Sequence, residues 1–266
     1  MAKQRLDKLL VSLELCESRA LAERLIRAGK VKVNQEIVDK PGTKIKTDAE
    51  IEVKEKPPYV SRGGKKLARA LNSFDIKVQD RICVDGGIST GGFTDCLLQS
   101  GAKLVYGVDV GSAQVAWTIR ISDRVILREK TNIRYLTPEE LYGDAAKADL
   151  GVMDLSFISL TKVLEAFWNL LAPPKEAVLL VKPQFEVGRE KVGKKGVVRD
   201  TGDRAAAIMQ VWQAAAELGW QYQGLTISPI TGPAGNVEYL LWLSTNPSKE
   251  EPLNFDKVKE IITSDT

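Results

Sequence analysis

Two lysines and two carboxylates stand where strands of a predicted α/β sheet begin or end, or in the loop that enters it: Lys66, Asp154, Lys182 and Glu238. Ligands of α/β proteins bind at such strand ends, so the four side chains are candidates for one site. A lysine amine that leaves an apolar strand loses hydration, and beside another cation this favours the neutral amine, which can accept a proton. Taken singly, each of these residues would more often be an ordinary ion-pair partner.

Histidine is absent from the 266 residues. This excludes Ser-His-Asp and Cys-His catalysis and any His-ligated metal site, so proton transfer has to use Lys, Asp, Glu or Tyr. The three cysteines are widely spaced without a CxxC pair, which indicates reduced, structural thiols rather than disulfides or a zinc site. We therefore expect no metal.

A glycine-rich stretch, Val84 to Thr94, follows an apolar run and leads into a predicted helix. Its glycines at 86, 87, 91 and 92 match neither the dinucleotide GxGxxG nor a P-loop, so a nucleoside without phosphates fits better. Asp109 ends the next strand, where a carboxylate can accept hydrogen bonds from ribose hydroxyls. Alternatively, the stretch is a plain turn and Asp109 a helix cap. Asn132, after the third strand, could contact an adenine edge or simply cap a helix.

The elements that position these residues alternate between strand and helix. Strands are predicted at 81–85, 103–109, 124–128, 149–154 and 177–181, and helices from the glycine turn to Ser100 and at 160–171 and 204–218. This alternation predicts a parallel sheet covered by helices. The last two strands, near 222–227 and 237–243, have no helix between them and should pair antiparallel. Such a terminal hairpin on a Rossmann-like sheet is typical of methyltransferases.

The first fifty-odd residues predict a smaller α+β unit. A helical pattern covers 5–11, Ser18 can cap a second helix that ends at Gly29, and 31–33 and 49–53 alternate like strands. Arg19, Arg24, Arg27 and Lys30 recur along the second helix and its exit, where they could line up on phosphates or form a solvated helix face. The succession SRALAERLIRAGKVKVNQEIV resembles the αL RNA-binding fold of a ribosomal small-subunit protein.

Pro57-Pro58 breaks the regular pattern and predicts a stiff linker. We therefore expect an RNA-binding domain at 1–56, a linker at 57–62, a catalytic domain at 63–246 and a tail at 247–266 that can form an amphipathic helix. The net charge is only +3, but 57–69 hold four basic and no acidic side chains and 182–199 hold six basic and two acidic ones. Such basic segments are typical of a surface that binds a polyanion, although solvent-exposed loops are also often rich in lysine.

The glycine-rich segment resembles the cofactor loop of FtsJ-like ribose methyltransferases. The resemblance implies S-adenosylmethionine as cofactor, with Asp85 near its methionine portion and Asp109 on its ribose. The residues implied around it are Gly87, Ser89, Gly91, Gly92, Phe93 and Thr94. The family usually carries a larger aliphatic residue at the position of Gly86, which could loosen the turn here.

The four polar residues together resemble the Lys-Asp-Lys-Glu tetrad of ribose 2′-O-methyltransferases. The resemblance implies that Lys182 takes the 2′-hydroxyl proton, that Asp154 and Glu238 orient the lysines, and that Lys66 supports the developing oxyanion. With the blocks SRGGKKL and DLSFISL, nearly the whole chain resembles the TlyA family of rRNA cytidine 2′-O-methyltransferases. This implies ribosomal RNA, in subunits or ribosomes, as substrate.

Further RNA-binding candidates follow from this resemblance and from the basic segment 57–69. Arg5 and Arg19 match RNA-contacting positions of the family, and Arg62 and Lys65 lie in the basic segment. Phe157 could support a base turned out of its helix, or it could be an ordinary core residue.

The sequence contains no apolar span of membrane length and no signal-peptide pattern at its start, so we expect a cytoplasmic protein that does not bind membranes. Two other classes of function stay open. One is a catalytically silent ribosome-binding or assembly factor, against which the complete tetrad argues. The other is membrane lysis, because members of the family have been called haemolysins, but no strongly amphipathic basic helix supports it.

Overall fold

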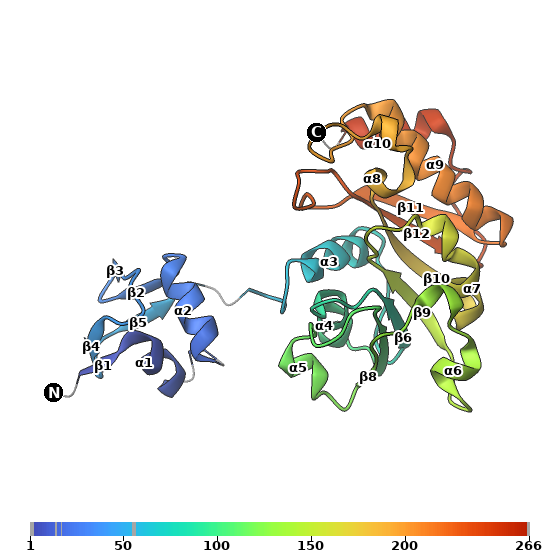
Figure 1. The fold of residues 1–266 in the computed structure, drawn as a ribbon. Coiled ribbons are helices and arrows are strands. Elements are labelled where there is room, and N and C mark those ends of the chain that lie inside the picture. Colours follow the sequence, from blue (N-terminus) through green and yellow to red (C-terminus); the bar gives the residue numbers. More distant parts are fainter. Residues whose placement is uncertain (1–2, 14, 17, 55–56, 265–266) are drawn as a thin grey trace. The chain divides into compact units, whose positions relative to one another are not determined.

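The computed structural model describes residues 3–13, 15–16, 18–54 and 57–264. Contacts divide the chain into two compact units, residues 1–58 and 59–266, which are described in turn (Figure 1). The expected end of the RNA-binding domain at Lys56 lies outside the described residues, as do the last two residues of the expected tail.

The first unit packs two helices on short strands. Ser18 caps α2 (Arg19–Arg27) by accepting a hydrogen bond from the Leu21 backbone N–H, and Gly29 turns the chain with a φ of +65°. Strand β2 (Val31–Val33) lies between β3 (Glu36–Ile37) and β5 (Ile51–Val53), antiparallel to both. Its core joins these elements through the buried apolar residues Leu6, Leu10, Cys16, Ala22, Leu25, Ile26, Val31 and Val33.

The first predicted helix begins one residue later than expected. Lys3–Arg5 form β1, which pairs antiparallel with β4 (Lys44–Lys46), and α1 covers Leu6–Ser12. Arg5 is therefore the last residue of a strand and not the start of a helix, because its backbone pairs with Lys44. The strand pairing is a long-range contact that helical spacing in the sequence does not reveal.

The second unit is built on a seven-stranded sheet in the order β11-β12-β10-β9-β6-β7-β8. Its parallel strands are β6 (Ile82–Gly86), β7 (Leu104–Val108), β8 (Val125–Arg128), β9 (Ala148–Met153) and β10 (Leu171–Val181). The chain runs outward from β6 through β7 and β8, then returns to β9 on the other side of β6. This reversal places a topological switch point between β6 and β9, where sheets of this type bind ligands beyond the carboxyl ends of their strands.

Strand β12 (Tyr239–Ser244) runs antiparallel to both of its neighbours, β10 and β11 (Gln221–Ile227). The predicted terminal hairpin is thereby confirmed. The Rossmann-like sheet with its terminal hairpin, preceded by a small α+β unit, confirms the predicted fold class.

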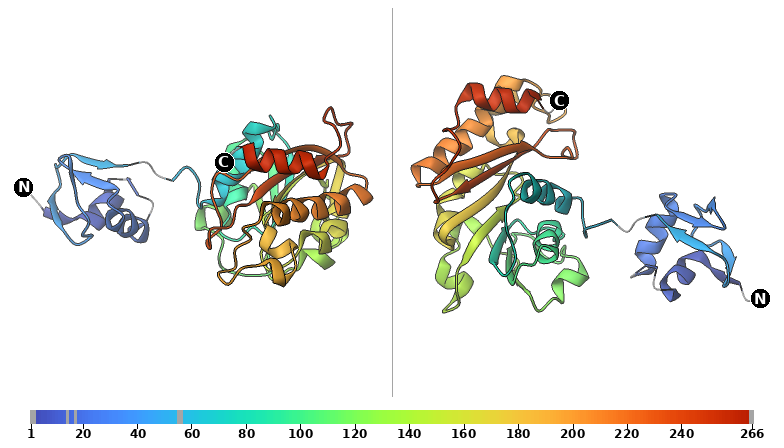
Figure 2. Two further views of the ribbon diagram at one scale, coloured as in Figure 1. Left: turned by 90° about the horizontal axis from the view of Figure 1, so that it is seen from above. Right: turned by 180° about the vertical axis from the view of Figure 1, so that it is seen from behind.

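Helices cover both faces of the sheet (Figure 1, Figure 2). One face is covered by α3 (Gly63–Ser73), α4 (Gly92–Gln99) and the short α5 (Trp117–Arg120). The other face is covered by α7 (Leu164–Leu170), α9 (Thr201–Glu217), α10 (Phe255–Ser264) and the short α6 (Pro138–Tyr142). Neighbouring strand residues divide between the faces: Leu179 packs with α7 and α9, Leu180 with α3 and α4. Burial on both faces explains the continuous apolar runs of these strands.

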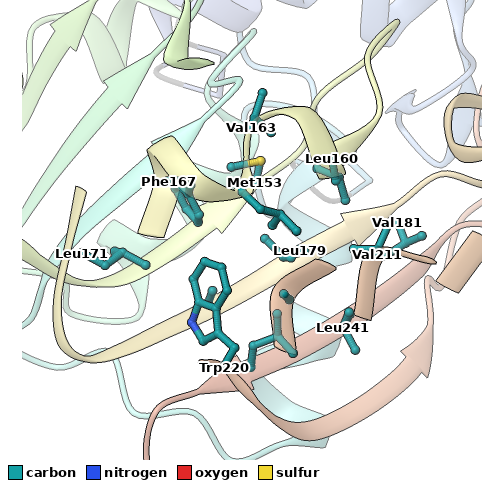
Figure 3. Packing of buried hydrophobic residues seen from close by; sticks show 14 of the residues in the cluster. Met153, Leu160, Val163, Phe167, Leu171, Leu179, Val181, Val211, Trp220 and Leu241 are labelled. Carbon is teal, nitrogen blue, oxygen red and sulfur yellow. The ribbon is translucent and has the colours of Figure 1, made fainter. Parts of the chain in front are cut away.

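The larger of the two cores lies between the sheet and α7, α9 and α10. Figure 3 shows Met153 and Leu179 of neighbouring strands packed among Phe167, Val211 and Trp220. The tail contributes to this core, because Val258 and Ile262 of α10 are buried in it and α10 packs along α9 (Figure 2).

Several predicted boundaries differ from the structure. The expected helix 160–171 is a 3₁₀ turn (Leu160–Lys162) followed by α7, and Leu171 already belongs to β10, where it pairs with Ala148. The expected helix at 204 begins at Thr201, because the Asp200 carboxylate accepts a hydrogen bond from the Asp203 backbone N–H and caps it. Glu238 lies one residue before the last strand.

None of the described helices is long and apolar enough to cross a membrane. Within the same part of the chain, no group of three or more His, Cys, Asp or Glu side chains is placed to hold a metal ion.

Candidate active site

The four candidate catalytic side chains form one chain of ionic contacts. Lys66 Nζ lies 2.6 Å from Glu238 Oε2 and 3.8 Å from Asp154 Oδ2. Lys182 Nζ lies 2.5 Å from the other carboxylate oxygen of Asp154, Oδ1. The order is therefore Glu238, Lys66, Asp154, Lys182, and Asp154 is shared by the two lysines.

Four separate elements deliver these side chains. Lys66 projects from the first turns of α3, Asp154 and Lys182 follow β9 and β10, and Glu238 precedes β12. Because β9, β10 and β12 are neighbours in the sheet, the residues at their ends meet at the same edge. Parallel β9 and β10 end together there, and antiparallel β12 begins there.

The site is largely withdrawn from water. Lys66, Lys182 and Glu238 are buried, and the Asp154 side chain is 20% exposed. Burying charges is costly unless they are paired, and here two ammonium groups balance two carboxylates. The arrangement holds a lysine amine beside a carboxylate in a partly dry pocket, which suits proton transfer from a hydroxyl group.

The glycine turn lies directly against Asp154. Gly87 has a φ of +88°, and a Cβ atom there would stand 2.6 Å from the Asp154 carbonyl oxygen. The Asp154 N–H also donates a hydrogen bond to the Gly86 carbonyl oxygen at 3.0 Å. A Cβ at Gly86 would stand 2.8 Å from Ile133 Cδ1, the tip of a side chain that would have to shift to make room. The small residue at this position therefore matches the place that Ile133 occupies in this chain.

A cavity of about 310 Å³ opens beside this turn. Asp109 lies in its wall, with its carboxylate fixed by the backbone N–H groups of Ser89 (2.8 Å) and Gly111 (2.7 Å). Apolar Val110 and Ile133 lie in the same wall. A carboxylate beside apolar surface offers partners for ribose hydroxyls and for an adenine ring, so these residues fit a nucleoside such as that of S-adenosylmethionine.

A second cavity of about 230 Å³ adjoins the first, and both are lined by Gly87, Ser89 and Asp154. Its wall includes Lys66 and the start of α4 at Gly92 and Phe93. The loop 230–233 closes another side. Since the two cavities meet at Asp154, a cofactor in one and an acceptor in the other could approach each other beside the ionic chain.

Asp85 and Thr94 lie under the turn and line neither cavity. Thr94 Oγ1 donates a hydrogen bond of 2.7 Å to Asp85 Oδ2, and Asp85 Oδ1 is buried with no partner. Burial raises the pKa of Asp85 to about 7, against the opposing effect of the Thr94 hydrogen bond. The structure thus places Asp85 as a support of the turn, with one carboxylate oxygen still able to accept a hydrogen bond.

Two other predicted cofactor residues also lie outside both cavities. Asn132 caps a 3₁₀ turn (Ile133–Tyr135) by accepting a hydrogen bond from the Arg134 N–H at 3.1 Å, and it lines a different hollow. Its neighbours Thr131 and Ile133 line the 310 Å³ cavity instead. Gly91 is the residue before α4, and its φ of +94° gives the turn its shape.

The predicted RNA-binding residues fall into two groups. Arg5 and Arg19 both hold the buried Asp7 carboxylate, with Nε contacts of 3.0 and 2.8 Å. The Arg5 hydrogen bond and then Arg19 keep the pKa of Asp7 well below its usual range, although its burial opposes this. Like Arg5 and Arg19, the residues of the second group are exposed; they are Arg24, Arg27, Lys30, Arg62 and Lys65. Of these, Arg62 lines the 230 Å³ cavity and donates a hydrogen bond to the Thr231 carbonyl oxygen.

Phe157 is not a core residue. Its side chain is 91% exposed at the mouth of the 310 Å³ cavity, and its backbone has a φ of +66°. The ring lies 5.4 Å, centre to centre, from that of Phe185. A fully exposed aromatic ring beside the site is available for stacking, so the core interpretation is wrong.

Ser156 is a further residue of the site, which the sequence did not single out. Its Oγ accepts a hydrogen bond of 3.0 Å from Lys182 Nζ, and it lines the 310 Å³ cavity. The only signal in the sequence was its position two residues after Asp154 in the block DLSFISL.

Comparison with known proteins places both units. A model of FtsJ-like methyltransferases matches residues 59–245, and an S4 domain model matches residues 4–51. The putative rRNA methyltransferase YqxC of Bacillus subtilis is 49% identical over 242 residues, covering 91% of this chain and 85% of that protein.

Two further relatives span almost the full length. The 16S/23S rRNA (cytidine-2′-O)-methyltransferase TlyA of Mycobacterium tuberculosis is 45% identical over 249 residues, covering 93% of this chain and 92% of that protein. A solved structure described as a putative hemolysin from Streptococcus thermophilus is 42% identical with a TM-score of 0.75, covering 99% of this chain and 96% of that one.

Proposed function

The chain belongs to the FtsJ-like methyltransferase family, and from this premise we propose that it methylates ribose 2′-hydroxyl groups of ribosomal RNA. Its kinship with the TlyA proteins, expected from the sequence, is confirmed, and the protein is an enzyme that uses S-adenosylmethionine. The observation that carries the ribose assignment is the ionic chain of Glu238, Lys66, Asp154 and Lys182 at the junction of two cavities.

Bound S-adenosylmethionine would supply an electrophilic methyl group. We assign its nucleoside to the 310 Å³ cavity, with Asp109 accepting hydrogen bonds from the ribose and Gly87 and Ser89 lying close beside it. Gly92 and Phe93 lie in the adjoining wall. Asp85, Gly91 and Thr94 keep the turn in shape from beneath.

In the proposed reaction, Lys182 takes the proton from the 2′-hydroxyl as the oxygen becomes nucleophilic. Asp154 holds the Lys182 amine in place, and Lys66, itself fixed by Glu238, offers positive charge to the developing oxyanion. The remaining task is alignment of acceptor and donor, for which rigid positioning suffices.

The proposed substrate is ribosomal RNA in subunits or ribosomes, with cytidine as the target base. The names of the Bacillus and Mycobacterium relatives and the S4 domain support this. We propose that the RNA is held by residues 1–56, with the segment 57–62 as linker, residues 63–246 as catalytic domain and 247–266 as tail. Phe157, exposed at the cavity mouth, would support a base turned out of the RNA helix. A ribosomal substrate implies action in the cytoplasm.

The test incubates the purified full-length chain with each ribosomal subunit and S-adenosylmethionine carrying a tritiated methyl group. We expect label in RNA that survives alkaline digestion as a dinucleotide, because a 2′-O-methyl group blocks cleavage at that position. Label in mononucleotides would indicate base methylation and overturn the ribose assignment.

Two further outcomes address the alternatives. Tight subunit binding without transfer of label would favour a silent assembly factor. Leakage of dye from liposomes exposed to the cofactor-free protein would favour membrane lysis. Lys182→Ala is the matched control, and it should abolish transfer while cofactor binding changes little.

A further inference from the structure

Lys182 has a second contact besides its carboxylate. Its Nζ donates to Ser156 Oγ at 3.0 Å while Asp154 Oδ1 lies 2.5 Å away. Asp154 and Ser156 are both in the segment that leaves β9, and both line the 310 Å³ cavity. One short segment therefore provides both an anionic and a neutral acceptor for the same amine.

Two acceptors have a geometric consequence for an amine that works as a base. A neutral amine nitrogen carries one carbon, two hydrogens and one lone pair in a roughly tetrahedral arrangement, and the charged form donates in three directions. When Asp154 and Ser156 engage two N–H groups, a single direction is left for the lone pair. Proton transfer depends on this direction, because the base must face the hydroxyl within hydrogen-bond reach.

The other polar groups around Lys182 are charged or titratable, and they interact with one another. Asp154 is shared with Lys66 at 3.8 Å, Lys66 contacts Glu238, and buried Asp85 experiences the charge of Asp154. Ser156 is neutral. Its removal therefore frees the orientation of the amine but leaves the ion pairs intact, whereas a change at any of the charged groups would disturb both.

We propose that Ser156 is a positioning residue that, together with Asp154, directs the Lys182 lone pair towards the acceptor hydroxyl. The proposal rests on the proposed methyl transfer, in which Lys182 is the base. It assigns Ser156 a role through Lys182 and not through contact with the cofactor.

The experiment compares Ser156→Ala and Ser156→Thr in the full-length chain. For Ser156→Ala, kcat for methyl transfer to ribosomal subunits should fall roughly tenfold or more, a part of the 10²- to 10⁴-fold usual for general base catalysis. KM for the subunit and Kd for the cofactor should change less than about twofold, because the ion pairs persist. Ser156→Thr keeps the hydroxyl and should restore most of the rate.

The pH dependence supplies a readout that a structural defect would not alter. Loss of a hydrogen-bond acceptor disfavours the charged amine, so the rise of kcat with pH should begin at lower pH in Ser156→Ala than in the wild type. Ser159→Ala is the matched control: Ser159 stands in the same loop but bonds Glu186 instead of Lys182, so it should leave the rise of kcat attributed to Lys182 at the wild-type pH.

A measurement without cofactor or RNA separates this proposal from the proposed function. Acetic anhydride labelling of Lys182, followed by peptide mass spectrometry, should show the same downward shift of its pH midpoint in Ser156→Ala, with Lys103 as internal reference. An inactive wild type would refute the methyl transfer while this shift could still be seen. An unchanged midpoint, an unchanged kcat in Ser156→Ala, or no recovery in Ser156→Thr would overturn the role of Ser156.

Discussion

Lys66 Nζ and Glu238 Oε2 lie 2.6 Å apart although 172 residues separate them in the chain. Their contact ties the start of α3 to the loop that enters β12, and both side chains are almost fully withdrawn from water. A buried charge whose partner is removed is strongly destabilising, so this pair should contribute to stability as well as to the site.

Glu238→Gln should lower the free energy of unfolding by about 3 kcal/mol, because it leaves the Lys66 ammonium buried without its nearest anion. The double variant Lys66→Met/Glu238→Gln removes both charges and should regain much of that loss, yet it should stay inactive. Chemical denaturation measures the first effect and methyl transfer the second. Equal stability of the single and double variants would contradict this account.

Gly87→Ala should weaken cofactor binding and destabilise the second unit by more than the roughly 1 kcal/mol of a simple left-handed penalty. A Cβ at Gly87 would meet the Asp154 carbonyl oxygen at 2.6 Å. Gly235→Ala is the control, since Gly235 has a similar φ of +92° but nothing lies within 4 Å of the added atom. Calorimetric titration and thermal unfolding of the two variants should differ clearly. Indistinguishable behaviour would show that the close approach is unimportant.

The buried carboxyl of Asp85 should make stability pH-dependent. Its pKa is raised to about 7 in the folded chain, above the value of 3.8 for an exposed aspartate. Between about pH 4 and pH 7 the folded state therefore binds more protons than the unfolded state, and stability is lost as pH rises through this window, by at most about 1.4 kcal/mol per pH unit. Asp85→Asn should remove this slope in cofactor-free denaturation curves. Parallel curves for wild type and variant would refute the assignment.

The two groups of arginines in the first unit should behave differently on mutation. Arg19→Ala leaves the buried Asp7 carboxylate with fewer partners and should lower the unfolding temperature as well as RNA affinity. Arg24→Ala and Arg27→Ala alter an exposed helix face and should reduce affinity and its salt dependence with unchanged unfolding. Filter binding at several salt concentrations, paired with thermal melts, distinguishes them. Loss of stability in the Arg24 and Arg27 variants would argue against this division.

The basic loop at residues 189–199 should contact RNA phosphates beside the target. Buried Asn236 fixes it near the site by accepting a hydrogen bond from the Val198 N–H (2.9 Å) and donating one to the Gly196 carbonyl oxygen (2.7 Å). Lys194→Glu/Lys195→Glu should therefore weaken subunit binding severalfold at low salt and much less at high salt.

The control for the basic loop carries the same charge change elsewhere. Lys103 and Lys147 are exposed and precede β7 and β9, at the opposite edge of the sheet from the site. Lys103→Glu/Lys147→Glu should bind like wild type. Equal losses in the two double variants would indicate a general effect of net charge and not a local contact.

The sequence by itself determined the main strands and helices of the second unit and the catalytic candidates, because the signals for both are local. Apolar runs that end in Asp154 and Lys182 mark strand ends in any parallel sheet, and the glycines from 86 to 92 mark the turn after β6. The helical spacing of apolar residues and the cap at Ser18 predicted α2. The absence of a helical pattern between the last two strands predicted the antiparallel hairpin.

Only the tertiary structure decided which of these residues touch. The order Glu238, Lys66, Asp154, Lys182, the hydrogen bond from Lys182 to Ser156 and the use of Arg5 and Arg19 on buried Asp7 all depend on side chains brought together from distant segments. Packing of the whole chain likewise decides which side chains are buried. Phe157 is exposed, and Asp85 is buried and does not line the cavity. The spacing of residues within one strand or helix determines which face each side chain occupies. Contacts between different strands and helices form only when the sheet and its helices pack together.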